Sequence, residues 1–123
     1  MDKASRKELT REYKETPRPV GVFRVWNRVN DKSFVGTALD LQAALNGQFA
    51  RLRFGGHPNT DLQKDWNELG AEAFEFEILD TLAPSDRPDD DPREDLRVLE
   101  ELWLDRLAPY DDRGYNKRPK GTA

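Results

Sequence analysis

The chain has 123 residues, of which 36% are hydrophobic and 36% are charged, and its net charge is −4. This length suits one domain with a modest core, and the absence of cysteine excludes disulfides, thiolate metal sites and a cysteine nucleophile. No apolar run is long enough to cross a membrane and the charged start does not resemble a signal peptide, so we expect a soluble, cytoplasmic protein.

The N-terminal half predicts a helical arm followed by a hairpin and a helix. Residues 3–15 predict a polar helix whose apolar anchors are Leu9 and Tyr13, and the prolines of ETPRP end it. Residues 21–27 and 33–36 are rich in aromatic and β-branched residues, which predicts two strands of a β-hairpin. Residues 40–54 have helical periodicity that ends at a glycine pair.

The C-terminal half predicts two more helices and a third strand. Thr60 opens a segment of capping-box form, which predicts a helix ending before Gly70. Residues 74–82 alternate apolar and acidic side chains and predict a half-buried strand. After a surface loop over 83–92, Asp91 as N-cap and Pro92 at N1 predict a helix to about Leu107. We expect one domain over 20–118, an arm over 1–19 and a disordered tail over 119–123.

One carboxylate lies on an apolar face. On the last predicted helix Glu100 falls within the arc of the apolar side chains, whereas Glu101 points to solvent. A carboxylate there costs several kcal/mol unless it is paired or bound to a cation. A buried salt bridge to an arginine and a metal-binding or catalytic role are equal alternatives. The apolar arc comprises Leu96, Leu99, Trp103 and Leu107.

Two further polar residues invite simpler explanations. Gln48 falls on the apolar face of helix 40–54, where a hydrogen-bonded core amide is the favoured interpretation. His57 is the single histidine of the chain and follows two glycines in GGHPN, so by itself it is compatible with an ordinary surface position.

The spaced motifs together resemble the GIY-YIG nuclease superfamily. The resemblance rests on GVF at 21–23, FVG at 34–36, the run GGHPNTDLQKDWNELG, FEFEIL, Glu100 to Trp103 and the final GYN at 114–116. It covers about residues 20–118 in the family's order. It implies an α+β fold with a small three-stranded antiparallel sheet flanked by helices, here with an extra N-terminal helix.

The resemblance also implies roles for individual residues. Glu100 matches the glutamate that holds a divalent cation, Mg²⁺ or Mn²⁺, in family members that cut DNA. Asn116 matches an asparagine near the end of the domain, and His57 matches a histidine found in part of the family. The two tripeptide tyrosines, which help activate water and organise the phosphate, are replaced by Phe23 and Phe34.

Two more family positions are replaced on helix 40–54. Ala44 stands where the family has an arginine that neutralises the phosphate, and Gln48 stands where it has a histidine. Phenylalanine has no O–H to hydrogen-bond or transfer a proton, and alanine cannot stabilise charge. Arg51 lies two turns from Ala44, about 10.5 Å along the helix, which is too far to substitute for the missing arginine.

These departures favour a GIY-YIG-like domain with a degraded active site that binds nucleic acid, DNA in the first instance, with little or no cleavage. One alternative is an active divalent-metal-dependent DNA endonuclease in which Glu100 binds the metal, His57 is the base and Asn116 positions the site. The second is a protein-interaction module that uses the acidic stretch 85–95. The charge distribution is compatible with nucleic-acid binding, which the degraded domain and the active endonuclease both require. Residues 1–64 hold 12 basic and 7 acidic residues, whereas residues 65–123 hold 8 basic and 17 acidic residues. The candidate phosphate contacts are Arg24, Arg28, Lys32, Arg51, Arg53, Lys64, Lys117 and Arg118.

Overall fold

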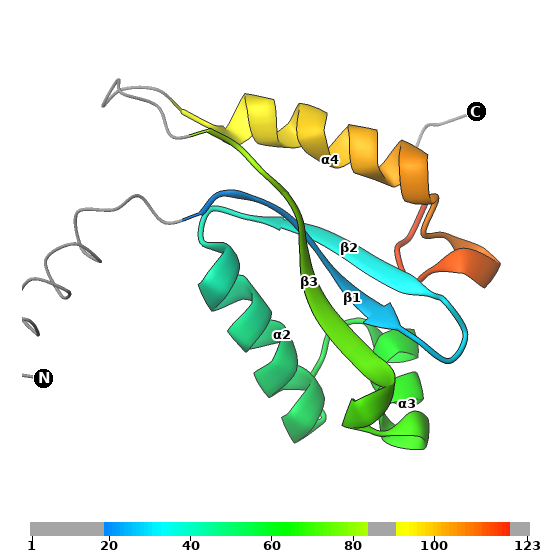
Figure 1. The fold of residues 1–123 in the computed structure, drawn as a ribbon. Coiled ribbons are helices and arrows are strands. Elements are labelled where there is room, and N and C mark those ends of the chain that lie inside the picture. Colours follow the sequence, from blue (N-terminus) through cyan, green and yellow to red (C-terminus); the bar gives the residue numbers. More distant parts are fainter. Residues whose placement is uncertain (1–18, 84–90, 119–123) are drawn as a thin grey trace, which may run out of the picture.

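A computed structural model describes residues 19–83 and 91–118 of this chain. Its middle layer is a three-stranded antiparallel sheet in the order β2-β1-β3. Helix α4 lies on one face of the sheet, and α2 and α3 lie on the other (Figure 1). The predicted α+β class and three-stranded sheet are therefore confirmed. The predicted helical arm, most of the acidic loop and the tail lie outside the described residues.

The elements follow the predicted order. The strands are β1 (Gly21–Asn27), β2 (Ser33–Ala38) and β3 (Phe74–Thr81). The helices are α2 (Leu41–Phe54), α3 (Thr60–Leu69) and α4 (Arg93–Leu107). Single 3-10 turns cover Ala71–Ala73 and Asp111–Arg113. In the described part of the chain, we find no helix with both the length and the apolar character to cross a membrane.

The strand register brings the two tripeptides together. Phe23 of β1 lies opposite Gly36 of β2, and Val25 lies opposite Phe34. Directly opposite residues of an antiparallel pair share a face. Val25 belongs to the core cluster beneath α2 and α3, and Phe34 packs against that cluster. The tripeptides therefore form one continuous surface on this side of the sheet. The core cluster comprises Val25, Leu52, Leu62, Trp66, Phe74 and Tyr115.

The start of α3 differs from the sequence prediction. The N-cap of α3 is Asn59, not Thr60, because the Asn59 side chain accepts a hydrogen bond from the Leu62 amide and asparagine caps at least as well as threonine. The predicted capping-box glutamine, Gln63, instead turns inward and donates to the Leu52 carbonyl.

The other differences are at the start of α4 and at the end of β2. The N-cap of α4 is Pro92, one position after the predicted N-cap, Asp91. Asp91 still accepts from the first helical amide, that of Arg93, at 3.0 Å. Strand β2 runs two residues beyond its predicted end, because pairing with β1 continues to Gly21 opposite Ala38.

Candidate active site

The C-terminal segment closes the outer edge of β2. Tyr115 donates its backbone N–H to the Ser33 carbonyl at 3.0 Å. Asn116 then clamps the middle residue of the second tripeptide: its Oδ1 accepts from the Val35 amide at 2.8 Å, and its Nδ2 donates to the Val35 carbonyl at 2.9 Å. Both ends of the Asn116 amide are therefore occupied by backbone, and its contribution to the site is to hold β2 in place.

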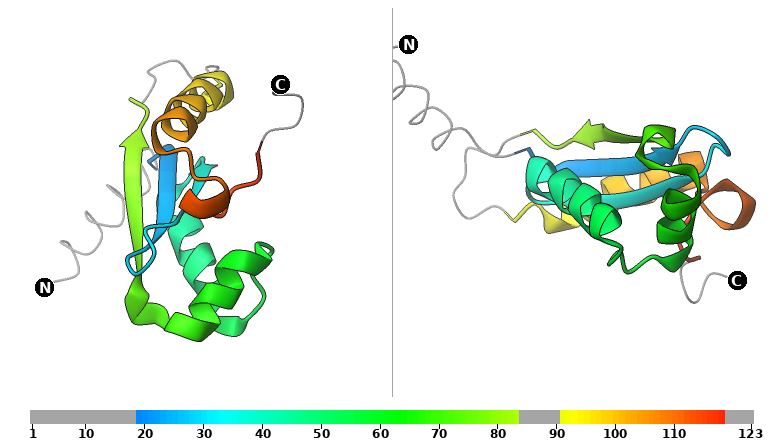
Figure 2. Two further views of the ribbon diagram at one scale, coloured as in Figure 1. Left: turned by 90° about the vertical axis from the view of Figure 1, so that its right-hand side faces the viewer. Right: turned by 90° about the horizontal axis from the view of Figure 1, so that it is seen from below.

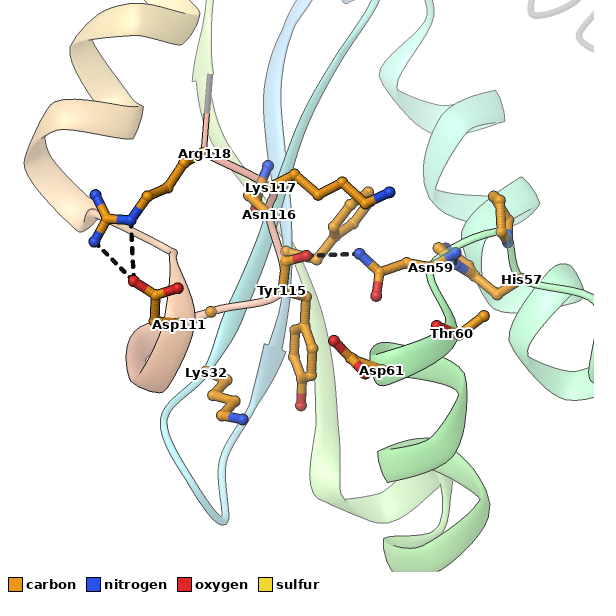
Figure 3. Close-up of a pocket in the computed structure, with 13 residues that line it drawn as sticks. Lys32, His57, Asn59, Thr60, Asp61, Asp111, Tyr115, Asn116, Lys117 and Arg118 are labelled. Carbon is orange, nitrogen blue, oxygen red and sulfur yellow. Dashed lines mark hydrogen bonds and ion pairs between the residues drawn. The ribbon is translucent and has the colours of Figure 1, made fainter. Parts of the chain in front are cut away.

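A pocket of about 770 Å³ opens beside this clamp. It brings together Phe34, His57 and Asn116, three predicted site residues that come from three separate segments (Figure 3). The loop leading into α3 forms one wall, and the segment that follows the 3-10 turn Asp111–Arg113 forms the other. The remaining lining residues are Lys32, Pro58, Asn59, Thr60, Asp61, Asp111, Gly114, Tyr115, Lys117 and Arg118.

His57 is buried and fully hydrogen-bonded. Its Nδ1 accepts from the Asn59 amide at 3.0 Å, so the ring proton lies on Nε2, which donates to Oε1 of Gln48 at 2.5 Å. Burial and the nearby Arg51 charge lower the pKa of His57. The edge of the ring contacts Phe34, with 5.5 Å between centroids. In this arrangement His57 is neutral and has no free lone pair to accept a proton.

Tyr115 is a buried wall of the pocket that the sequence reasoning did not single out. Its hydroxyl donates to Asp65 Oδ2 at 2.6 Å and accepts from Asn27 Nδ2 at 3.0 Å. Burial, and then the hydrogen bond to Asp65, raise the pKa of Tyr115 to about 12. Its hydroxyl is therefore a structural link between β1 and α3. The motif GYN placed it beside Asn116, but its partners are far away in the sequence.

The two tripeptide phenylalanines and Ala44 place only hydrocarbon at three predicted site positions, and of the three only Phe34 lines the pocket. Phe23 is 3% exposed, and its ring lies across Gly36: a Cβ built on this glycine would be 2.6 Å from Phe23 Cζ. Phe34 is half-buried against His57. Ala44, in the first half of α2, contributes only a methyl group. None of these three positions offers a hydrogen-bond donor or a charge.

Glu100 faces a second, smaller hollow at the other end of β2. This hollow, of about 340 Å³, lies between α4 and the end of β2, where Thr37 to Leu39 form its far wall. It is about 10 Å along the strand from Phe34, at 3.3 Å per residue. Phe23 lies opposite Gly36 and lines neither hollow, and α4, which carries Glu100, lies on the face of the sheet opposite α2 and α3.

The Glu100 carboxylate has no hydrogen-bonding or ion-pair partner among the described residues. Two arginines line the same hollow: Arg97 pairs with Glu94 and Glu101, at 2.6 Å each, and Arg93 is 3.5 Å from Asp91. The alternative of a buried salt bridge to arginine is therefore wrong for the described chain. Burial, and then the charge of Glu101, raise the pKa of Glu100.

Glu100 is the one acidic residue among the described residues that line its hollow, which it shares with Arg93 and Arg97. No group of three or more His, Cys, Asp or Glu side chains gathers among the described residues. Mg²⁺, however, binds commonly through one or two carboxylates with waters and substrate phosphates filling the other positions. Glu100 would supply one such carboxylate, and water and substrate would have to fill the other positions.

Three of the predicted basic residues border the larger pocket. Lys32 comes from the hairpin, and Lys117 and Arg118 come from the C-terminal segment (Figure 3). Arg118 is paired with Asp111 at 2.8 Å. Asp61 also lines the pocket, so the cations only slightly outnumber the acids there.

The other predicted basic residues lie elsewhere. Arg24 is paired with Glu77 of β3 at 2.7 Å, and Arg28 is 3.4 Å from Glu75. These pairs neutralise much of the predicted basic face of the hairpin. The remaining three, which are exposed on α2 and α3, are Arg51, Arg53 and Lys64.

The three-stranded antiparallel sheet, the helices on both faces and the two tripeptides side by side define a GIY-YIG-like domain. The fold is similar to the catalytic domain of the homing endonuclease I-TevI, with a TM-score of 0.66 and 27% sequence identity over 81% of this chain and 99% of that one. A second structure of that domain, a glutamate-to-alanine mutant, has a TM-score of 0.64 and 26% identity over 80% and 92% of the two chains. No protein-family model and no curated protein sequence matches this chain.

Proposed function

We propose that this chain is a nuclease-like domain that binds nucleic acid, DNA in the first instance, and cleaves it little or not at all. The observation that carries the proposal is the absence of polar groups at three positions that the resemblance assigns to the site. Phe23 and Phe34 occupy the two tripeptide positions where the resemblance implies hydroxyl groups, and Ala44 occupies the position of a guanidinium.

Each replacement removes a separate contribution to phosphodiester hydrolysis. A missing proton-transfer group costs about 10²–10⁴ in rate, and a missing electrostatic partner costs about 10²–10³. The losses are not additive, but several in one site leave little chemistry. His57 does not compensate in the arrangement described, since its acceptor nitrogen is bonded to the Asn59 amide.

The surroundings of the site support binding. Lys117 and Arg118 are exposed where the pocket meets solvent, and Lys32 lies across from them. Side chains of this kind neutralise phosphates and release counterions, so binding through them weakens as salt rises.

The test is binding and cleavage of linear, branched and plasmid DNA by the native chain, Glu100→Ala and, as a matched control, Glu101→Ala. Glu101 is adjacent on α4 but exposed, and it pairs with Arg97. We expect binding that falls steeply between about 50 and 200 mM salt, with no Mg²⁺- or Mn²⁺-dependent cleavage by any of the three proteins. Failure to bind at any salt would refute the proposal and favour a protein-interaction module.

The alternative of an active endonuclease rests on Glu100. Its unpaired carboxylate could hold Mg²⁺ or Mn²⁺, and such a cation would supply Lewis-acid stabilisation of the phosphate and a more acidic bound water. Asn116 would keep β2 in register beside it. Cleavage that disappears in Glu100→Ala and persists in Glu101→Ala would establish this alternative.

A further inference from the structure

The two outer edges of the sheet differ. The edge of β2 is closed by the chain itself, through the Asn116 clamp on Val35 and the bond from Tyr115 to Ser33. Strand β3 forms the opposite margin, with β1 on its inner side (Figure 2, left). Among the described residues, the Phe74 N–H is taken by the Ala71 carbonyl, and no backbone hydrogen bond reaches the outer side of β3 from Phe76 to Ile78.

A backbone hydrogen bond just before β3 shows which groups of the strand face outward. Arg28 donates to the Ala73 carbonyl just before the strand, so Ala73 faces β1. Backbone groups of a strand alternate in direction, and those of Phe76 and Ile78 therefore point to the open edge, up to the register shift that follows Ile78. Near its end the strand protects itself, since the Thr81 amide donates to the side chain of Asp80.

The side chains along this edge are apolar on one face. Ile78 is 41% exposed, and so is Phe49 of α2, whose ring contacts Phe76 with 5.8 Å between centroids. A strand added at this edge would place its apolar residues, at alternate positions, against these aromatic and aliphatic side chains.

The opposite face of the edge carries one exposed, weakly paired acid. Glu75 and Glu77 alternate with the apolar residues. Glu77 is paired with Arg24 at 2.7 Å, whereas Glu75 is only loosely paired, 3.4 Å from Arg28 with both side chains about half exposed. A basic or hydroxyl side chain opposite Glu75 would complement it. Nucleic acid is a poor occupant, because the exposed charge is acidic and the other face of the edge is apolar.

We propose that the open edge of β3 binds an extended segment of a protein partner as a fourth strand. The segment would carry apolar residues at alternate positions and lysine, arginine or threonine between them. A second copy of this chain fits badly. Two β3 strands related by a two-fold axis centred on Phe76 would place Glu75 opposite Glu77, and centring on Glu77 would place that residue opposite itself. The open edge of β3 is the edge of the sheet opposite β2. The inference does not depend on the proposed function.

The experiment is amide hydrogen exchange by NMR on the full chain, alone and with a soluble peptide that alternates valine and lysine over the length of β3. In the free chain we expect Phe76 and Ile78 to exchange rapidly, whereas Glu75 and Glu77, which face β1, exchange slowly. The peptide should slow exchange at Phe76 and Ile78 about tenfold or more, and the same peptide N-methylated along its pairing edge should have no effect.

Matched variants check the side chains. Ile78→Lys should weaken peptide binding about tenfold, whereas Val98→Lys, which replaces an exposed apolar residue on α4, should leave it unchanged. The N-methylated peptide keeps the test valid if Ile78→Lys does not fold.

Three results would overturn the proposal. Equal effects of the two peptides would show that pairing is not involved, and no response at millimolar peptide would show that the edge binds nothing of this kind. Slow exchange of Phe76 and Ile78 in the free chain would show that the edge is already occupied. Dilution would then identify the occupant, since it releases a second copy but not the chain's own residues 1–18.

Discussion

Replacing Gly36 by alanine tests the close contact between the two tripeptides. A Cβ at this position would lie 2.6 Å from Phe23 Cζ and 2.9 Å from Cε1. Carbon atoms approach favourably to about 3.5–4.0 Å, so the buried ring would have to retreat by about 1 Å. Overpacking of this kind costs about 1–3 kcal/mol, and the lower chain entropy of alanine returns about 0.5–1 kcal/mol. We expect Gly36→Ala to lower the free energy of unfolding by about 1–2 kcal/mol.

The assay is urea unfolding followed by circular dichroism, with Gly47→Ala as the control. Gly47 lies within α2, and a Cβ there would meet nothing within 4 Å, so its replacement should stabilise the chain by about 0.5–1 kcal/mol. In a Phe23→Leu background, which shortens the opposing side chain, the penalty of Gly36→Ala should shrink. Equal effects of the two glycine substitutions, or an unchanged penalty in the Phe23→Leu background, would refute the reasoning.

Three other predictions concern the site. The pKa of His57 is lowered in the folded chain, so the unfolded chain binds a proton at this residue first as the pH falls. The free energy of unfolding should therefore be at its full value above about pH 6.5 and should decrease below it by at most about 1.4 kcal/mol per pH unit. Urea unfolding at several pH values should show this slope in the native chain and not in His57→Gln. Asn116→Ala removes two hydrogen bonds to Val35 and should cost about 1–3 kcal/mol; an unchanged unfolding midpoint and unchanged exchange of the Val35 amide would contradict this. Lys117→Ala should reduce the salt dependence of DNA binding by about one counterion, measured by fluorescence anisotropy; an unaltered slope would remove this lysine from the interface.

Local patterns were sufficient to predict most of the fold. The β-branched and aromatic run at 21–27, the helical period that ends at Gly55 and the alternation after Phe74 each depend on near neighbours in the sequence, and each element is present. The N-cap of α3 was missed because Thr60 and Asn59 are both good caps, and the inward turn of Gln63 decides between them.

The site was harder to predict because its contacts are non-local. Periodicity placed Glu100 on an apolar face, and helical spacing could also have paired Arg97 with Glu94 and Glu101, which are three and four residues away on α4. The pairing of Arg24 with Glu77, 53 positions away, left no signal in either segment.

Plasmid nicking by the native chain, beside Phe23→Tyr/Phe34→Tyr/Ala44→Arg, is the most direct test of a degraded site. We predict no nicking by the native chain with Mg²⁺ or Mn²⁺, and nicking by the triple variant that is lost again when Glu100→Ala is added. Nicking by the native chain that Glu100→Ala abolishes would contradict the loss of cleavage and establish an active endonuclease.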